Sequence, residues 1–373
     1  MHVRLQTPVD GIDTASCEVR LSSGERLSYD NLVVATGARA NGLDVPGTDR
    51  EGVFVLRNLE DAIAVKSYLA ATPCRKAVIL GAGFIAMEMA ENFSARGMET
   101  IIVHRGELPV ARWDPEFSKI IRDEVTARGV TFVTGAVTAA IEGAAASRLA
   151  LVTDRGTFDA DIILMALGIR PDATLAGEAG IELGKTGAIR VDYAQRTSLE
   201  NVYAAGDCCE VYHRVAHEWV SMPLGDIANK QGRVAGSTIG GKPLTFPGIV
   251  GAQSFRVFGL EAAATGIDEE GAAGSGYDPG STIVWGSPVA RVMNPESRRL
   301  GLKLVADRKT GKLLGAQAVG SEGAVSRINT LSACLWSGLD IDDVGYLDLA
   351  YAPPFSGAWD LIHMAAQQLR RTL

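Results

Sequence analysis

The sequence predicts an α/β protein built on parallel sheets and followed by an antiparallel C-terminal part, on three observations. Residues 77–105 have the pattern of a strand, a glycine turn, a helix and a second strand. Two more apolar segments, 161–167 and 202–205, each stop at a glycine, where a ligand can approach a strand end. Beyond Gly240-Gly241-Lys242-Pro243 the chain changes to antiparallel strand patterns. With 373 residues, it is long enough for two or three domains.

The turn in residues 81–86 has the spacing G-x-G-x-x-A. Gly81 lets the chain reverse tightly, Gly83 lets backbone approach a pyrophosphate, and Ala86 lets helix and strand pack closely. The helix over 84–96 offers free N–H groups and a positive dipole end to the phosphates. We therefore predict dinucleotide binding, with an ordinary packing corner as the alternative. The core stripe of this helix is expected at Ile85, Ala86, Met89, Ala90 and Phe93.

The second strand of this unit ends on His104-Arg105. An NAD-binding unit usually ends that strand on an acid, which bonds the ribose 2′-OH. A guanidinium suits a 2′-phosphate instead, by bidentate hydrogen bonding. The strand end therefore favours NADPH over NADH, and a solvated arginine is the plain alternative.

Composition restricts the classes of partner. The net charge of −8 argues against nucleic acid or an anionic membrane surface. The sequence has neither an apolar run of transmembrane length nor a signal-peptide start, so we expect a cytoplasmic enzyme. Five cysteines form no C-x-x-C and no metal-ligand pattern, which fits a reducing compartment and predicts no metal site.

The other elements follow from apolar periodicity and turn residues. Short strands are expected over 3–30, with a hairpin loop at 22–25, and a compact strand at 31–35 leads into Thr36-Gly37. Helices are expected at 61–70, 115–128, 223–239, 324–336 and 358–371, and further strands at 130–133, 149–153, 287–293, 300–307 and 313–320.

Four motifs in order give the chain a family resemblance. They are Thr36-Gly37, the run from Gly81 to Glu88, Ala166 to Pro171, and Tyr203 to Asp207. Together they resemble the flavin-dependent pyridine nucleotide-disulfide oxidoreductases. The closing YAPPFSGAWD and the earlier ANKQGRVAG are most similar to the coenzyme A-disulfide reductase and NADH oxidase branch. The resemblance covers essentially the whole chain.

The resemblance implies two Rossmann-like domains, one inserted in the other, and a C-terminal α+β dimerisation domain. It implies an FAD-binding domain in two parts, 1–74 and 161–246, an NAD(P)-binding domain at 75–160, and dimerisation through 247–373. The implied cofactors are FAD and NADP or NAD, and the implied assembly is a homodimer. A small-molecule disulfide is the implied substrate, with no nucleic acid or membrane partner.

The resemblance also implies site residues. Cofactor contacts fall on Thr36, Gly37, Gly81, Gly83, Phe84, Ile85, Ala86, Glu88, His104, Arg105, Gly168, Gly206, Asp207, Pro223 and Leu224. Asp207 would bond the flavin ribityl chain, and the helix after Pro223-Leu224 would point its N-terminus at the flavin pyrimidine. Asn229, Lys230 and Arg233 are candidate substrate contacts. Taken alone, Gly206-Asp207 fits a plain turn and Glu88 a solvated helix face.

Tyr351 is the candidate catalytic residue, because a tyrosine of this branch reaches the partner's cysteine and flavin, and its phenol can donate or accept a proton. A tyrosine packed in a dimer interface is the alternative. His363, on the following helix, is expected at the surface or an interface. Members of the branch often carry Tyr-Pro where Met293-Asn294-Pro295 stands, which makes coenzyme A a less secure substrate.

Two family features have no counterpart in the sequence: the first G-x-G-x-x-G unit, and the helix that carries the redox cysteine. We therefore expect Met1 to be an internal start. Cys208-Cys209 follow the flavin motif directly and are expected to be small buried thiols. Three functions stay open: a flavoenzyme passing hydride from NAD(P)H to a small disulfide or persulfide, an NADH oxidase or peroxidase, and a non-catalytic nucleotide-binding module.

Overall fold

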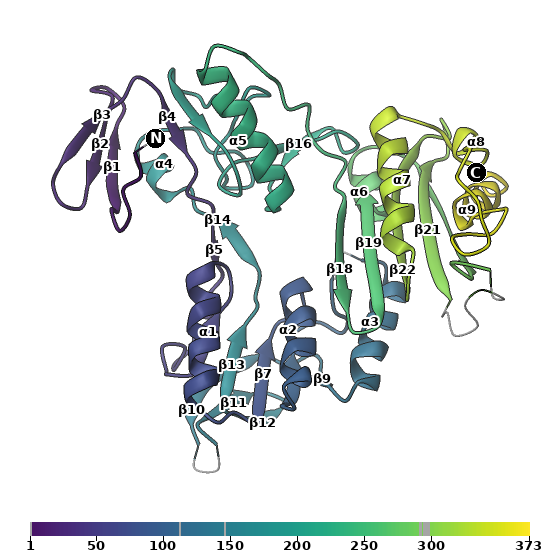
Figure 1. Cartoon of the computed structure of the whole chain (residues 1–373), viewed down its shortest axis with the longest axis horizontal. Helices are drawn as coiled ribbons and strands as arrows, with labels where there is room; N and C mark the ends of the chain where they lie inside the picture. Colours follow the sequence, from purple (N-terminus) through teal and green to yellow (C-terminus); the bar gives the residue numbers. More distant parts are fainter. Residues whose placement is uncertain (1, 112, 145–146, 291–292, 294–298) are drawn as a thin grey trace. The chain divides into compact units, whose positions relative to one another are not determined.

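The computed structural model describes residues 2–111, 113–144, 147–290, 293 and 299–373. Its chain forms two compact units, one of residues 1–39 and 169–249, the other of residues 40–168 and 250–373. Figure 1 labels helices and strands of both units. The second unit joins segments that the sequence analysis divided between three functional domains, and that functional division stays a prediction.

The first unit consists of small sheets and two helices. Its strands are β1 (Val9–Asp13), β2 (Glu18–Leu21), β3 (Arg26–Ser28), β4 (Leu32–Val34), β14 (Ile169–Pro171), β15 (Val202–Ala204), β16 (Val211–His213) and β17 (Glu218–Val220), with β5 (Ala38–Ala40) at its edge. Its helices are α4 (Thr174–Glu178) and α5 (Gly225–Ile239). Strands β1-β2-β3 form an antiparallel sheet, and β4 pairs with β15 in parallel. The predicted hairpin loop at 22–25 joins β2 to β3.

A five-stranded parallel sheet begins the second unit, in the order β6-β13-β7-β8-β9. Its strands are β6 (Val53–Val55), β7 (Lys76–Leu80), β8 (Glu99–Val103), β9 (Thr131–Val133) and β13 (Ile162–Met165). Helices α1 (Leu59–Ala71), α2 (Phe84–Ala95) and α3 (Pro115–Ala127) alternate with them, and β10 (Thr138–Gly143), β11 (Leu149–Thr153) and β12 (Gly156–Ala160) form an antiparallel sheet.

This part of the second unit has three layers. Ala77 and Ile79 of β7 pack into the core under the helices, whereas Val78 and Leu80 pack with residues of the β10-β11-β12 sheet. Figure 1 shows α2 beside β7, and α1 contacts β6. Because both faces of the parallel sheet are covered, β7 has a continuous apolar run instead of an alternating one.

The C-terminal part is a five-stranded antiparallel sheet with helices against it. Its strands, in the order β18-β19-β22-β21-β20, are β18 (Gln253–Val257), β19 (Leu260–Gly266), β22 (Leu313–Gly320), β21 (Leu300–Asp307) and β20 (Pro279–Gly286). Its helices are α6 (Glu269–Gly274), α7 (Ala324–Ser337), α8 (Ile341–Val344) and α9 (Leu361–Arg370). Strands β21 and β22 match the predicted segments residue for residue.

The strand predicted at 287–293 is wrong for its described residues. The structure ends β20 at Gly286, and residues 287–290 lie outside any strand. The register explains this, because Gly286 already pairs with Leu300, the first residue of β21. Asn294 and Pro295, which stand where the branch often has Tyr-Pro, lie outside the described residues.

The buried face of α2 differs from the predicted stripe. Ala86, Ala90 and Phe93 are buried as expected, but Met87 is buried as well and Ile85 is 36% exposed. The reason is that α2 packs against both β8 and β18, so its apolar face is shared between two sheets. The start of the helix therefore leaves Ile85 facing outward.

One hydrophobic core runs through both five-stranded sheets of the second unit. It includes Ile79 and Ile102 of the parallel sheet, Phe117 of α3, and Phe255 and Ala262 of the C-terminal sheet. These parts therefore fold on a common core. Among the described residues, no helix has both the length and the apolarity that a membrane span requires.

Candidate cofactor sites

The first candidate site is the turn that follows β7. Gly81 has φ +101°, and a Cβ there would collide with the carbonyl group of Ala166, which follows β13. The Gly81 N–H donates to the Val103 carbonyl (2.9 Å) and the Ala166 N–H to the Leu80 carbonyl (2.8 Å). The turn is therefore fixed between the ends of its two neighbouring strands, and only glycine fits.

Gly83 is glycine for a different reason. Its φ of −82° suits any residue, and a Cβ there would meet no atom within 4 Å. Gly83 is exposed and is the N-cap of α2, which has no side-chain cap and no acid in its first turn. By contrast, Asn58 caps α1 and Asp114 caps α3. The uncapped start leaves N–H groups and the positive dipole end for an anion.

The other predicted residues of α2 surround this start. Ile85 and Glu88 are exposed, Phe84 is half-buried and Ala86 is fully buried, where it allows close packing. Partial burial, with Glu91 as a second cause, raises the pKa of the Glu88 carboxyl. A carboxyl with a raised pKa beside a glycine turn at a strand end is a candidate functional position.

His104 and Arg105 follow β8, one strand over from the turn. The His104 N–H donates to the Val133 carbonyl (2.9 Å), and burial, with the Arg105 charge second, lowers the pKa of its ring. Arg105 is exposed. The structure therefore places an exposed guanidinium at the carboxyl edge of the sheet, next to the strand that leads into Gly81. Gly168 is also exposed, with φ +86°, shortly after β13.

The second candidate site lies in the first unit, where β4 and β15 end side by side. Val34 pairs with Ala204, and each strand then reaches a glycine in the left-handed region, Gly37 (φ +73°) and Gly206 (φ +90°). Thr36 is exposed and Asp207 is half-buried. The Thr36 hydroxyl donates to the Asp172 carbonyl (2.5 Å). Carboxyl ends of adjacent parallel strands are where open α/β sheets bind ligands.

Gln231 positions this second turn, which the sequence analysis did not foresee. Its side chain is 1% exposed; Oε1 accepts from the Gly206 N–H (2.9 Å) and Nε2 donates to the Glu210 carbonyl (3.1 Å). The sequence predicted substrate contacts at Asn229, Lys230 and Arg233 of this helix and no role for Gln231. Only the fold reveals that Gln231 turns inward.

Cys208 and Cys209 are buried free thiols, as predicted. The Cys208 thiol donates to the Ala205 carbonyl (3.4 Å) and the Cys209 thiol to the Gly206 carbonyl (3.3 Å). A hydrogen bond from Cys209 is the largest of the causes that lower the pKa of Cys208 to about 7. Both thiols therefore belong to the packing beneath the second turn.

Helix α5 starts after the predicted residues Pro223 and Leu224, both half-buried. Leu224 is its N-cap, with no side-chain cap bond. The candidate substrate residues Asn229, Lys230 and Arg233 are all exposed on this helix. The Lys230 ammonium pairs with Asp226 (2.9 Å), so a substrate anion would compete with that carboxylate.

Tyr351 lies in the second unit and is 56% exposed, in the segment that leads to α9. His363, predicted at the surface or an interface, does not lie on the surface of this chain, because the residue is only 7% exposed. Its Nδ1 accepts from the Asp360 N–H (3.2 Å), completing a capping box, and its Nε2 bonds the Leu347 carbonyl (2.8 Å). His363 thus fixes the start of α9.

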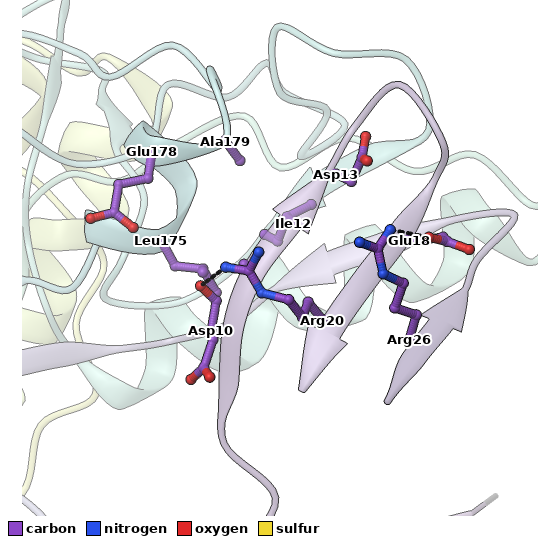
Figure 2. A pocket seen from close by; sticks show the side chains of 10 residues that line it. Asp10, Ile12, Asp13, Glu18, Arg20, Arg26, Leu175, Glu178 and Ala179 are labelled. Atoms are coloured by element: carbon purple, nitrogen blue, oxygen red, sulfur yellow. Dashed lines mark hydrogen bonds and ion pairs between the residues drawn. The ribbon is translucent and has the colours of Figure 1, made fainter. Parts of the chain in front are cut away.

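A cavity of about 200 Å³ in the first unit involves none of the predicted site residues. It lies between the β1-β2-β3 sheet and α4, as Figure 2 shows. Arg20 donates to the Asp10 carbonyl (3.2 Å), and Arg26 pairs with Glu18 (3.1 Å). Both guanidinium groups therefore already contact other residues that line the cavity.

The geometry defines a class of protein: an α/β chain with two glycine turns at strand ends, each beside an uncapped helix start. The chain belongs to the pyridine nucleotide-disulphide oxidoreductase family, whose main domain matches residues 1–232 and whose dimerisation domain matches residues 252–362. This confirms the family, the α/β fold class and the flavin-dependent NAD(P)H oxidoreductase class predicted from the sequence.

Two relatives and one solved structure show which members of the family this chain is similar to. The chain is 36% identical over 372 residues to an NAD(P)H coenzyme A polysulfide/persulfide reductase of Pyrococcus horikoshii, covering 99% of this chain and 83% of that one. It is 29% identical to an NADH oxidase of Methanocaldococcus jannaschii, covering 100% and 84%. An NAD-dependent persulfide reductase structure from A. fulgidus superposes with TM-score 0.93 at 34% identity, covering 98% and 68%.

Proposed function

We propose that the chain is the NAD(P)H-dependent part of a flavoenzyme that reduces a small disulfide or persulfide of the coenzyme A type. The relatives named as persulfide reductases support the substrate class. The observation that carries the proposal is Gly83. Its backbone conformation does not require glycine, and the space beside it, at the uncapped start of α2, is open. A pyrophosphate fits that space, because the backbone N–H groups are its natural donors.

The residues present fit both cofactors. Gly81 and Gly83 would receive the NAD(P)H pyrophosphate, and Arg105 a 2′-phosphate. Thr36-Gly37 and Gly206-Asp207 would receive FAD, with the N-terminus of α5 toward the pyrimidine. Bound flavin supplies two-electron transfer between nicotinamide and sulfur. In this scheme the chain binds and orients the two cofactors, and Glu88, on the helix that follows the glycine turn, is the proposed carboxyl beside the nicotinamide.

The overall reaction balances without another reactant. One NAD(P)H and one proton reduce one disulfide to two thiols, and a persulfide to a thiol and hydrogen sulfide. We assign Asn229, Lys230 and Arg233 to anionic groups of the substrate, because all three are exposed on one helix. Tyr351 is the proposed proton donor from a second copy, because its phenol is exposed in the part that matches the dimerisation domain.

The test is anaerobic oxidation of NADPH by the purified protein with its bound flavin. Oxidation that requires added coenzyme A disulfide, with two thiols formed per NADPH, is the expected result. Replacing Lys230 by Ala should then raise the KM for the disulfide about tenfold or more, since a charged hydrogen bond contributes roughly 1.5 to 3 kcal/mol. Lys119, exposed on α3, provides the matched Lys→Ala control.

A second function is supported by the relative named NADH oxidase. In that case NADH oxidation would need oxygen and no disulfide. A colourless preparation that binds NADPH but oxidises it under neither condition would instead favour the non-catalytic module.

A further inference from the structure

We propose that Lys303, in the C-terminal antiparallel sheet, is a positioning residue for the nucleotide turn at Gly81–Gly83 and acts on it through Asp114. The inference rests on the proposed function, because it takes that turn as the NAD(P)H site. It adds a residue outside the parallel sheet, 220 positions along the chain from Gly83.

Lys303 has a buried ionic environment. Its side chain on β21 is 6% exposed, and its ammonium contacts the Asp114 carboxylate and Glu269 of α6 (2.8 Å). Glu269 also accepts from the Ser281 hydroxyl (2.5 Å). A buried lysine is costly to desolvate unless it is paired, so this network is held only while both carboxylates stay in place.

Asp114 connects the network to the segment between β8 and α3. It is 9% exposed and caps α3 by accepting from the Glu116 N–H (3.3 Å). Its own N–H donates to Oε1 of Gln317 on β22 (2.9 Å). Two neighbouring strands of the C-terminal sheet therefore hold Asp114, one by the carboxylate and the other by the backbone.

Two backbone hydrogen bonds continue from there to the nucleotide turn. The Trp113 N–H donates to the Val110 carbonyl (2.8 Å), and the Val110 N–H donates to the Ala82 carbonyl (2.9 Å). Ala82 lies between the two glycines of the turn. Val110 has φ +46°, a conformation that is unfavourable for a β-branched residue and persists only when its surroundings impose it.

Aromatic packing joins the same elements. Phe84, the first residue of α2, stacks on Phe255 of β18 with ring centroids 4.7 Å apart. Trp113 meets both rings edge-on, at 6.4 and 5.6 Å. Trp113, which precedes Asp114, thus contacts the helix start that would bind the pyrophosphate.

The chemical consequence is preorganisation. A pyrophosphate gains most from N–H donors that are already held in place, because ordering them during binding would reduce the affinity. If Asp114 is held less firmly, the affinities for NADPH and NADH should fall by the same factor, because both dinucleotides contain the pyrophosphate. That distinguishes Lys303 from Arg105, whose loss should affect NADPH alone.

The experiment is calorimetric titration of the folded protein with NADPH and with NADH, well below the melting temperature. Lys303→Met should raise both dissociation constants about tenfold, equivalent to about 1.4 kcal/mol. Lys303→Arg, which keeps a cation, should restore most of the affinity. Lys119→Met is the matched control, because Lys119 lies on the exposed face of α3 and pairs with Asp123 (2.6 Å).

Unchanged dissociation constants in folded Lys303→Met would overturn the proposal. If that variant does not fold, Asp114→Asn with Lys303→Met replaces it. The double change removes both deeply buried charges and leaves only Glu269, whose side chain is 39% exposed, and asparagine also caps a helix. Gly83→Asp separates the two hypotheses. If it abolishes binding while Lys303→Met has no effect, the nucleotide turn stands and the Lys303 inference fails. If Gly83→Asp binds normally, both fail.

Discussion

Two glycines in the connections before and after α2, Gly81 and Gly97, are glycine for different reasons. Gly81 is in the left-handed region and faces the Ala166 carbonyl, whereas Gly97, past the helix end, has φ +77° and open space. Gly81→Ala should reduce the free energy of unfolding by roughly 3 kcal/mol or more, from strain plus collision, and should abolish nucleotide binding. Urea denaturation measures the first effect and NADPH titration the second.

Gly97→Ala is the control for that substitution. It should reduce the free energy of unfolding by about 1 kcal/mol, from the left-handed conformation alone, and keep nucleotide binding. Equal losses in the two variants would show that the Ala166 carbonyl imposes no constraint on Gly81.

The guanidinium of Arg105 should decide cofactor preference. Arg105→Ala should weaken NADPH by about tenfold or more, because a charged hydrogen bond contributes about 1.5 to 3 kcal/mol, and should leave NADH unchanged. Arg96→Ala is the control, because Arg96 is also exposed but lies at the C-terminal end of α2, away from the glycine turn. An unchanged ratio of the two dissociation constants in Arg105→Ala would rule out 2′-phosphate recognition by this residue.

At the residue scale, prediction succeeded where the requirement is local. The glycine spacing and the strand ends could be found in the sequence because each depends on a few neighbouring residues. The burial of Ile85 was predicted wrongly because it depends on β18, far along the chain. The surface alternative for His363 failed because its ring bonds the Leu347 carbonyl, a contact that helical periodicity does not indicate.

At the element scale, the hairpin of β16 and β17 has a pH-dependent component. Burial, with His217 second, lowers the pKa of His213 to about 4 from 6.5, and its Nδ1 accepts from the Ala216 N–H (3.1 Å). The unfolded chain therefore binds the proton more readily. Stability is complete above pH 6.5 and falls toward pH 4, by about 3 kcal/mol from this group.

His213→Gln should remove this pH-dependent contribution to stability. Between pH 6.5 and 4, the free energy of unfolding of the variant should therefore fall less than that of the wild type. Urea denaturation across this range measures the difference. His217→Gln, at an exposed position, should retain most of the loss because burial of His213 is the larger cause. If the free energy of unfolding depends on pH in the same way for the wild type and for His213→Gln, His213 is not the source of the pH dependence.

Elements were predicted best where hydrophobic pattern and turn chemistry agree. Strands β21 and β22 are separated by the turn at Arg308–Gly311, and both boundaries were found. The strand at 287–293 was misplaced because pairing, not local apolarity, ends β20 at Gly286. Which face of α2 is buried depends on β18, so helical periodicity alone could not define it.

At the scale of the molecule, the shared core makes the second unit cooperative. Phe255 is 6% exposed and stacks on Phe84, so Phe255→Ala should reduce the free energy of unfolding by about 3 to 5 kcal/mol. Hydrogen exchange should then lose protection in α2 and β7 together with β18. Loss confined to β18 and β19 would mean that the two sheets unfold independently.

The family and fold class could be predicted because several motifs in order constrain the whole chain. The shared core could not, since it joins Ile79 to Phe255, and neither residue carries a motif that indicates the other. Lys303 was missed for the same reason: within its strand LGLKLVAD it fits an ordinary solvated position.

The central claim, that a nicotinamide dinucleotide binds at the Gly81–Gly83 turn, is tested most directly by titrating Gly83→Asp with NADPH. Aspartate is a good N-cap and its Cβ would meet no atom within 4 Å, so the melting temperature should stay or rise while NADPH binding is lost to the added carboxylate. Gly236→Ala, on an open face of α5, should bind as the wild type does. NADPH binding by folded Gly83→Asp with wild-type affinity would contradict the claim.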